Sequence, residues 1–121
     1  MRSFLLLIIT LSYNSIALAD NFPKQLVCQE INNETILPST WSLLGEAKVK
    51  DLYKFIDGNL YISSAVQKEE HHGKLNRMVG LGLKYFVEYK TFVFSNAFKE
   101  ATLVDHNRSV IKIAKLQCTK I

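Results

Sequence analysis

The only potential metal ligands or acid–base catalysts that cluster in the sequence are Glu69-Glu70-His71-His72. Imidazole and carboxylate groups bind zinc and exchange protons near neutral pH. Neighbouring residues of a strand, however, point to opposite faces, and adjacent histidines lack the spacing that zinc ligands usually show. We therefore interpret residues 67–74 as a solvated loop or an exposed hairpin end, and we expect no metal and no cofactor.

Two further positions carry side chains that could act in catalysis, His106 and Asp51. His106 lies in Asp105-His106-Asn107-Arg108, a composition typical of turns, and no Gly-x-Ser-x-Gly elbow is present to supply a serine nucleophile. Asp51 is the one acid on the more apolar face of its expected strand, beside Tyr53; if buried, it needs a partner or a raised pKa. We place Asp51 at a bulge or at the rim of a barrel. No set of residues predicts an enzyme.

The two cysteines, Cys28 and Cys118, lie near the two ends of the expected mature chain. They do not form a Cys-x-x-Cys motif and have no histidine-rich neighbourhood, which argues against a redox or metal pair. In an oxidising compartment they form one disulfide. It closes a loop of about 90 residues. By restricting the unfolded chain, it contributes at most ~4–5 kcal/mol of stability.

The first 19 residues have the pattern of a cleaved secretory signal. Arg2 supplies the positive charge, residues 4–11 form a short apolar run, and Ala17-Leu18-Ala19 precedes the expected cleavage at Asp20. The apolar run is too short to cross a bilayer core of ~30 Å, so we expect no stable membrane span after cleavage. The protein is then secreted or periplasmic, with one domain over residues 20–121. Cleavage removes one of the 15 basic residues, Arg2, and none of the 11 acidic ones, so the mature charge is +3.

The last third of the chain has the clearest strand signals. Tyr89–Ser95 is aromatic and β-branched, Glu100–Asp105 follows it, and Val110–Cys118 is the last segment. In that last segment Ile111 and Ile113 alternate with Val110, Lys112 and Ala114, which places the two sets on opposite faces of a sheet. The sequence predicts antiparallel strands with a turn at 105–108.

Strands are also predicted in the first two thirds of the chain. Asp57-Gly58 is the strongest hairpin signal, and we expect it to join strands at Glu46–Ile56 and Asn59–Val66. The remaining predictions are a lead-in at Asp20–Lys24, a strand at Gln25–Ile31, a turn at Asn32–Thr35 and a bent or bulged strand at Leu75–Lys84. Asn33-Glu34-Thr35 and Asn107-Arg108-Ser109 match the N-glycosylation sequon.

These elements predict an all-β protein, a small single-domain antiparallel meander of seven to eight strands. A closed barrel is preferred to a sandwich because closure removes exposed edges, and a disulfide between the first and last strands would hold the seam. In size, disulfide and expected barrel, the chain is similar in architecture to small bacterial lysozyme inhibitors. The similarity is one of architecture and not of sequence motif.

The function expected from these features is binding rather than catalysis. The main hypothesis is a protein partner bound in an inhibitor-like manner, and the alternative is a small apolar ligand carried in a lipocalin-like interior. A small secreted hydrolase or isomerase is a third alternative, and an exported protein of this charge is not expected to bind nucleic acid. The candidate partner or ligand contacts are Tyr53, Tyr61, Tyr85, Tyr89, His71 and His72.

Overall fold

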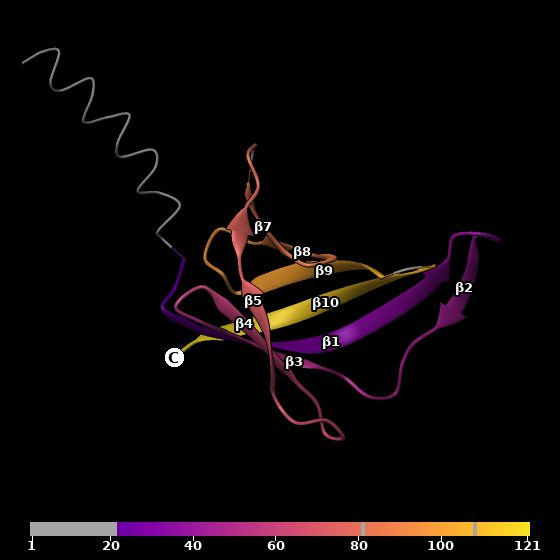
Figure 1. Ribbon diagram of the computed structural model, residues 1–121, viewed down its shortest axis with the longest axis horizontal. Helices are drawn as coiled ribbons and strands as arrows, with labels where there is room; N and C mark the ends of the chain where they lie inside the picture. Colours follow the sequence, from indigo (N-terminus) through magenta and orange to yellow (C-terminus); the bar gives the residue numbers. More distant parts are fainter. Residues whose placement is uncertain (1–21, 81, 108) are drawn as a thin grey trace, which may run out of the picture.

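The computed structural model describes residues 22–80, 82–107 and 109–121, and all regular structure in them is β-strand (Figure 1). The predicted signal segment lies outside the described residues. No helix in the described ranges is long and apolar enough to cross a membrane. The strands are β1 (Gln25–Leu37), β2 (Ser42–Gly45), β3 (Leu52–Ile56), β4 (Asn59–Ser63), β5 (Glu70–Lys74), β6 (Asn76–Arg77), β7 (Leu83–Val87), β8 (Lys90–Phe94), β9 (Glu100–Asn107) and β10 (Val110–Lys120).

The strands form one antiparallel sheet that is nearly closed into a barrel. Its order is β5-β4-β3-β1-β10-β9-β8-β7-β6, with β2 paired to the outer end of β1. Only Leu75 separates β5, which pairs with β4, from β6, which pairs with β7. Chain continuity therefore links the two edges of the sheet, and β5 with β6 serves as one bent strand of an eight-stranded meander. The predicted barrel-like fold is confirmed.

The predicted disulfide is also confirmed, since Cys28 and Cys118 are bonded. They are register partners in the ladder between β1 and β10, the N- and C-terminal strands. A disulfide of this kind is compatible with an oxidising extracellular compartment.

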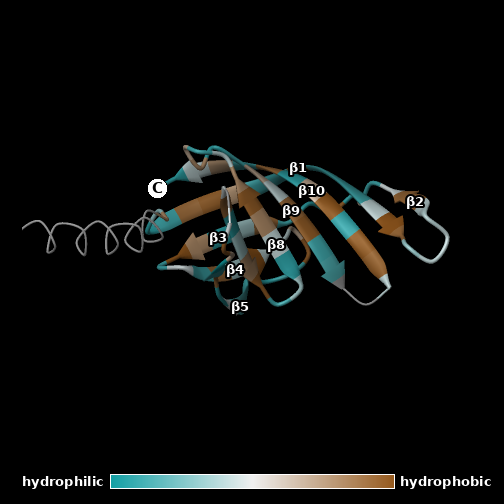
Figure 2. Cartoon of the chain, turned by 90° about the horizontal axis from the view of Figure 1, so that it is seen from above, coloured by the Kyte–Doolittle hydropathy of each residue, from teal (hydrophilic) through white to brown (hydrophobic). Residues whose placement is uncertain are grey.

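Side chains alternate between the inside and the outside of the barrel, as the bands of hydropathy along the long strands show (Figure 2). On β10, Ala114, Leu116 and Cys118 are buried while Ile113 faces outward, so the predicted split of this strand is correct. The core is largely aromatic, with Phe55 and Phe92 fully buried.

The hairpin at Asp57-Gly58 is present but shorter than predicted. Ile56 pairs with Asn59 directly across the two-residue turn, and both turn residues have positive φ angles of 50° and 79°, as this type of turn requires. The strand begins only at Leu52, and residues 46–51 form no strand. Their backbone is instead held by side chains of β1, as described below.

Four other sequence predictions are wrong in detail. The turn expected at Asn32–Thr35 is part of β1, because a bulge at Ile31 keeps the strand paired with β10 beyond it. Residues 70–74 of the expected loop form β5. The single bent strand expected at Leu75–Lys84 is interrupted, with only β6 before the start of β7. Finally, the predicted strand Glu100–Asp105 extends further than expected, because His106 and Asn107 of the expected turn also lie within β9, where His106 pairs with Ile111.

The lead-in at Asp20–Lys24 was expected to be loose, but Phe22 packs into one end of the barrel. Its ring makes edge contacts with Phe55, Tyr85, Phe94 and Phe98, with centroid distances of 5.0–5.5 Å. Phe22 is partly buried there, so it contributes less than the about 1.5–3 kcal/mol of a fully buried phenylalanine. We call this the plugged end, and the opposite end, where β1 continues into β2, the open end.

Candidate functional site

At the open end, β1 and β2 extend beyond the rest of the barrel as a projecting arm, here residues 36–45 (Figure 1). Ile36 pairs with Leu43 and Leu37 with Ser42, so the arm is a short antiparallel ladder. Three large apolar side chains on it are exposed to solvent, Trp41 at 78%, Leu43 at 64% and Leu44 at 58%. Apolar side chains gathered on a projection typically mark an interaction site.

The arm is tied to the barrel by five polar residues that we call the anchor cluster. Glu30 and Asn33 belong to β1, Asp51 immediately precedes β3, Tyr53 lies in β3, and Lys112 is on β10. Glu30 and Asn33 are each only 2% exposed. Buried polar groups require partners, and this pair has them.

Glu30 is the centre of the anchor cluster. Its carboxylate accepts hydrogen bonds from Asn33 Nδ2, from the Tyr53 hydroxyl at 3.2 Å and from the Asp51 amide at 3.3 Å. Lys112 Nζ lies 3.0 Å from Glu30 Oε2 and 3.2 Å from Asp51 Oδ2, and so pairs with both acids. Every partner of this buried carboxylate therefore comes from the protein itself, and one of them is a cation, as burial of such a group requires.

This arrangement raises two pKa values, those of Tyr53 and Lys112. Burial raises the pKa of the Tyr53 phenol well above its usual 10.0, and the negative charges of Glu30 and Asp51 raise it further. Burial by itself lowers the pKa of the Lys112 ammonium, but the hydrogen bonds and charges of Glu30 and Asp51 outweigh it, so the pKa lies above 10.5. Both groups remain protonated in the folded protein at physiological pH.

The anchor cluster also fixes the chain that returns from the arm. The Ala47 amide donates to Asn33 Oδ1 at 2.7 Å, and Lys50 Nζ donates to the Ile31 carbonyl at 2.7 Å. Residues 39–50 are otherwise all exposed, so few apolar contacts hold them. The conformation of the arm therefore depends on hydrogen bonds to β1 on one side and on the β1–β2 ladder on the other.

The Glu30 side chain has no exposed surface, so it cannot touch a bound substrate. The acids and the lysine of the anchor cluster are engaged with one another and with backbone amides. We therefore assign the anchor cluster a structural role. No set of three or more His, Cys, Asp or Glu side chains in the described ranges is arranged to hold a metal ion.

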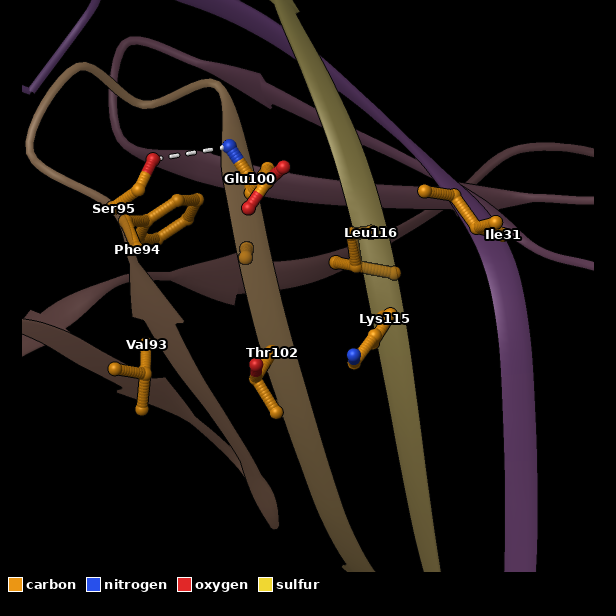
Figure 3. Close-up of a pocket in the computed structure, with 9 residues that line it drawn as sticks. Ile31, Val93, Phe94, Ser95, Glu100, Thr102, Lys115 and Leu116 are labelled. Atoms are coloured by element: carbon orange, nitrogen blue, oxygen red, sulfur yellow. Dashed lines mark hydrogen bonds between the residues drawn. The ribbon is translucent and has the colours of Figure 1, made fainter.

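Two shallow grooves lie beside the arm on the outer face of the sheet. One, of about 430 Å³, is lined by Leu43 and Glu46 next to Ile113 and Lys115 of β10. The other, of about 450 Å³, shares Lys115 and continues across β9 and β8 to Val93 (Figure 3). Figure 3 shows Val93, Thr102 and Lys115 on three neighbouring strands, with Ile31 at the bulge of β1. The arm thus continues into a face that mixes apolar side chains with both acidic and basic ones.

The contact residues proposed from the sequence lie in different places. Tyr53 and Tyr85 are buried, so a protein partner at the surface does not reach them. Tyr89 is exposed at the turn between β7 and β8. The structure does not bring these three together, and the arm, which the sequence analysis did not single out, is the larger exposed apolar feature.

The remaining predicted contacts are on β4 and β5. Tyr61 is half-buried and lies against His71, with ring centroids 4.9 Å apart. His72 points to the other face of β5, where its Nδ1 is 2.8 Å from Glu88 Oε1, across the gap between β5 and the end of β7. The two histidines therefore do not share a site. Their role as partner contacts, and that of Tyr61 and Tyr89, stays a prediction.

The side chain of Asn33, the first residue of one sequon, is part of the folded structure. The side-chain amide is buried and bonded to Glu30 and to the Ala47 backbone, so it is not accessible for modification in the folded protein. The composition around Trp41, a single tryptophan followed by Leu43 and Leu44 in a polar segment, is the signal from which the arm could have been found.

Comparison with known proteins identifies no relative: no protein-family model, no curated protein and no solved structure matches this chain.

Proposed function

We propose that this protein is an exported binding protein that inserts its arm into an apolar cleft of a protein partner. The observation that carries the proposal is the exposure of Trp41, Leu43 and Leu44 on one projecting ladder. Tryptophan is the residue type most enriched at the energetic centres of protein interfaces. A convex projection fits a concave surface, which is the shape of a hydrolase cleft, so an inhibitor-like role is the form of binding that we favour.

The anchor cluster supports this proposal, because a loop that is already ordered loses less entropy when it binds. Glu30 and Asn33 are hydrogen-bonded to amides on the segment that leaves the arm. Such buried polar groups do little for stability in comparison with apolar packing. Their placement next to an exposed apolar projection is explained if they hold the projection in its binding conformation.

The interior argues against the alternative of an apolar-ligand carrier. Phe55, Leu60, Phe92 and Leu103 are fully buried in the core, with Phe22 packed against them at the plugged end. At the open end the interior holds the charged anchor cluster. A binding cavity for an apolar ligand needs a largely apolar lining around free volume of a few hundred Å³.

The single tryptophan makes the test direct. The protein is used to capture partners from the compartment into which it is exported, and each captured protein is purified. Binding is then followed through Trp41 fluorescence, taken as the emission of the mixture minus that of the partner alone, with a purified lysozyme as the first defined candidate. We expect the emission to shift to shorter wavelength, because insertion into a cleft removes the indole ring from water.

The decisive comparison is between two apolar truncations. Trp41→Ala is expected to weaken binding of the purified partner about 30-fold, the effect of a typical interface centre. The matched control is Val79→Ala, which removes an exposed apolar side chain from the loop between β6 and β7. Binding that is followed by a label and is equally strong in both variants would contradict the proposal.

A further inference from the structure

A second candidate site lies at the plugged end of the barrel, away from the arm. It is a pocket of about 370 Å³ between the lead-in, the β3–β4 turn and the strands around Leu75. Phe22, Leu75 and Tyr85 supply apolar surface, while Lys24, Lys74 and Arg77 contribute three positive charges. This volume is in the range of pockets that hold small organic molecules.

The charges of this pocket are unbalanced. Lys24, Lys74 and Arg77 take part in no ion pair with any other residue that the structure describes. Asp57 is the one acid in the lining, and it too pairs with none of them. The formal charge of the pocket is therefore +2. Three cations around one small volume repel one another, and an anion between them removes that repulsion.

The second observation is the Tyr85 hydroxyl. Tyr85 lines the pocket and is only 4% exposed, and its hydroxyl is buried with no hydrogen-bond partner among residues 22–80, 82–107 and 109–121. An unpaired buried hydroxyl costs about 1–3 kcal/mol. The guanidinium of Arg77 lies over the same ring, with Cζ 5.9 Å from its centroid. The pocket lining therefore includes a residue with an unpaired donor, and the cation of Arg77 lies against its ring.

The backbone around the pocket is held in place before any ligand binds. The Asp57 amide donates to the Lys24 carbonyl at 2.8 Å, and the Leu75 amide donates to the Gly58 carbonyl at 2.7 Å. These bonds join the lead-in, the β3–β4 turn and the β5–β6 junction. A preformed pocket loses less entropy on binding than one that must be assembled.

We propose that this pocket binds a small organic carboxylate, with its apolar body on Phe22, Leu75 and Tyr85 and its carboxylate facing Arg77 and Lys74. The planar fork of an arginine matches a carboxylate, and the apolar lining selects an organic anion over an inorganic one. This site is independent of the proposed partner binding. Residues 25–35 of β1 lie between it and the arm, a separation of up to ~40 Å at the usual rise per residue of a strand.

The test uses phenylacetate as the probe, with phenylacetamide and inorganic phosphate as comparisons. Calorimetry and NMR titration of the purified protein should show saturable binding of phenylacetate, at least about tenfold tighter than that of the isosteric uncharged amide. The affinity should fall as salt is added, since exposed cations contribute to it. Equal affinity for the amide, or tighter binding of phosphate, would overturn the proposal.

Variants then locate the site. Lys74→Gln combined with Arg77→Gln should weaken phenylacetate binding about tenfold. The control is Lys84→Gln combined with Lys115→Gln, which removes the same charge from exposed positions elsewhere and should leave the affinity unchanged. Tyr85→Phe should weaken binding and yet raise the thermal midpoint of the free protein, because it removes an unpaired hydroxyl. Equal weakening by both lysine-containing pairs would show nonspecific charge attraction and refute the site.

Discussion

At the scale of single residues, the charge on Glu30 has the largest consequences. It is a carboxylate with no exposed surface, and one cation, Lys112, offsets both it and Asp51. Such a pair adds little net stability in comparison with apolar residues of the same shape, but breaking it is costly because one charge stays buried alone. The position of Glu30, on the inner face of β1 next to a bulge, is where this chain departs from an ordinary apolar barrel interior.

The first prediction concerns Lys112. Lys112→Met should lower the free energy of unfolding by about 3 kcal/mol, because it leaves the Glu30 carboxylate buried without its cation. The control is Lys115→Met on the same strand, where the side chain is exposed and the expected change is within about 0.5 kcal/mol. Urea unfolding of both variants makes the measurement. Equal effects of the two substitutions would show that Lys112 does not stabilise the buried carboxylate of Glu30.

The second prediction is a loss of stability in alkali. Above pH 10, Tyr53 releases its proton in the unfolded chain but keeps it in the folded protein, where its pKa is raised by burial and by Glu30. The folded state then binds more protons, so the free energy of unfolding falls as the pH rises. The raised pKa of Lys112 acts in the same direction above 10.5.

Urea unfolding at pH 9 and pH 11 measures this effect. Tyr53→Phe should make the loss of stability between the two pH values smaller than in the unaltered protein. Tyr89→Phe, at an exposed tyrosine, should not change it. An identical pH dependence of Tyr53→Phe and the unaltered protein would contradict the assignment to Tyr53.

At the scale of elements, the arm is a strand extension whose order depends on one buried amide. Asn33 accepts a hydrogen bond from the Ala47 amide and donates to Glu30. Without it, residues 46–47 lose their link to β1, while the β1–β2 ladder at the outer end of the arm remains. The arm is therefore held by the β1–β2 ladder on one side and by hydrogen bonds of Asn33, Glu30 and Lys50 on the other, and Asn33 holds the residue of that segment nearest the arm.

The third prediction follows from that link. Asn33→Ala should lower the hydrogen-exchange protection of the Ala47 amide selectively, and it should weaken partner binding by leaving the arm less ordered. The stability of the whole domain should fall by about 1–3 kcal/mol, the effect of an unpaired buried group. Amides in the ladder between β7 and β8, which β10 and β9 separate from β1 in the sheet order, serve as the internal control. Unchanged protection at Ala47 would refute the role of Asn33.

At the scale of the whole molecule, the barrel is closed by two different devices. The ladder between β1 and β10 is long, with the disulfide in it. The other edges meet through chain continuity at Leu75, through packing of Gly73 near Val87 and through the His72–Glu88 contact. The first closure is covalent and the second is local. The barrel should therefore open first between β5 and β7.

The fourth prediction concerns the covalent closure. Cys118→Ala should lower the free energy of unfolding by about 4 kcal/mol, because a loop of about 90 residues is no longer closed in the unfolded chain. The β1–β10 ladder on both sides of the cysteine should preserve the fold, which circular dichroism checks. Chemically reduced protein without a substitution is the control and should lose a similar amount. Free thiols in natively exported protein would remove the basis of this prediction.

The amino-acid sequence by itself determined the class of fold. Three predictions were correct: the alternation along Val110–Cys118, the turn at Asp57-Gly58 and the disulfide between Cys28 and Cys118. The first two depend on local geometry, and the third on a single long-range covalent bond. Strand periodicity is a property of neighbouring residues, so it is visible without knowing what a strand packs against.

The tertiary structure alone decided how the arm projects from the barrel and which residues meet in the anchor cluster and in the pocket at the plugged end. Asn32–Thr35 has the composition of a turn, but pairing with β10 and the bonds of Asn33 make it a strand. The anchor cluster joins positions 30, 51 and 112, and the pocket at the plugged end joins positions 24, 74 and 77. Nothing in the local pattern predicts these encounters, because they depend on the register of strands that are far apart in the chain.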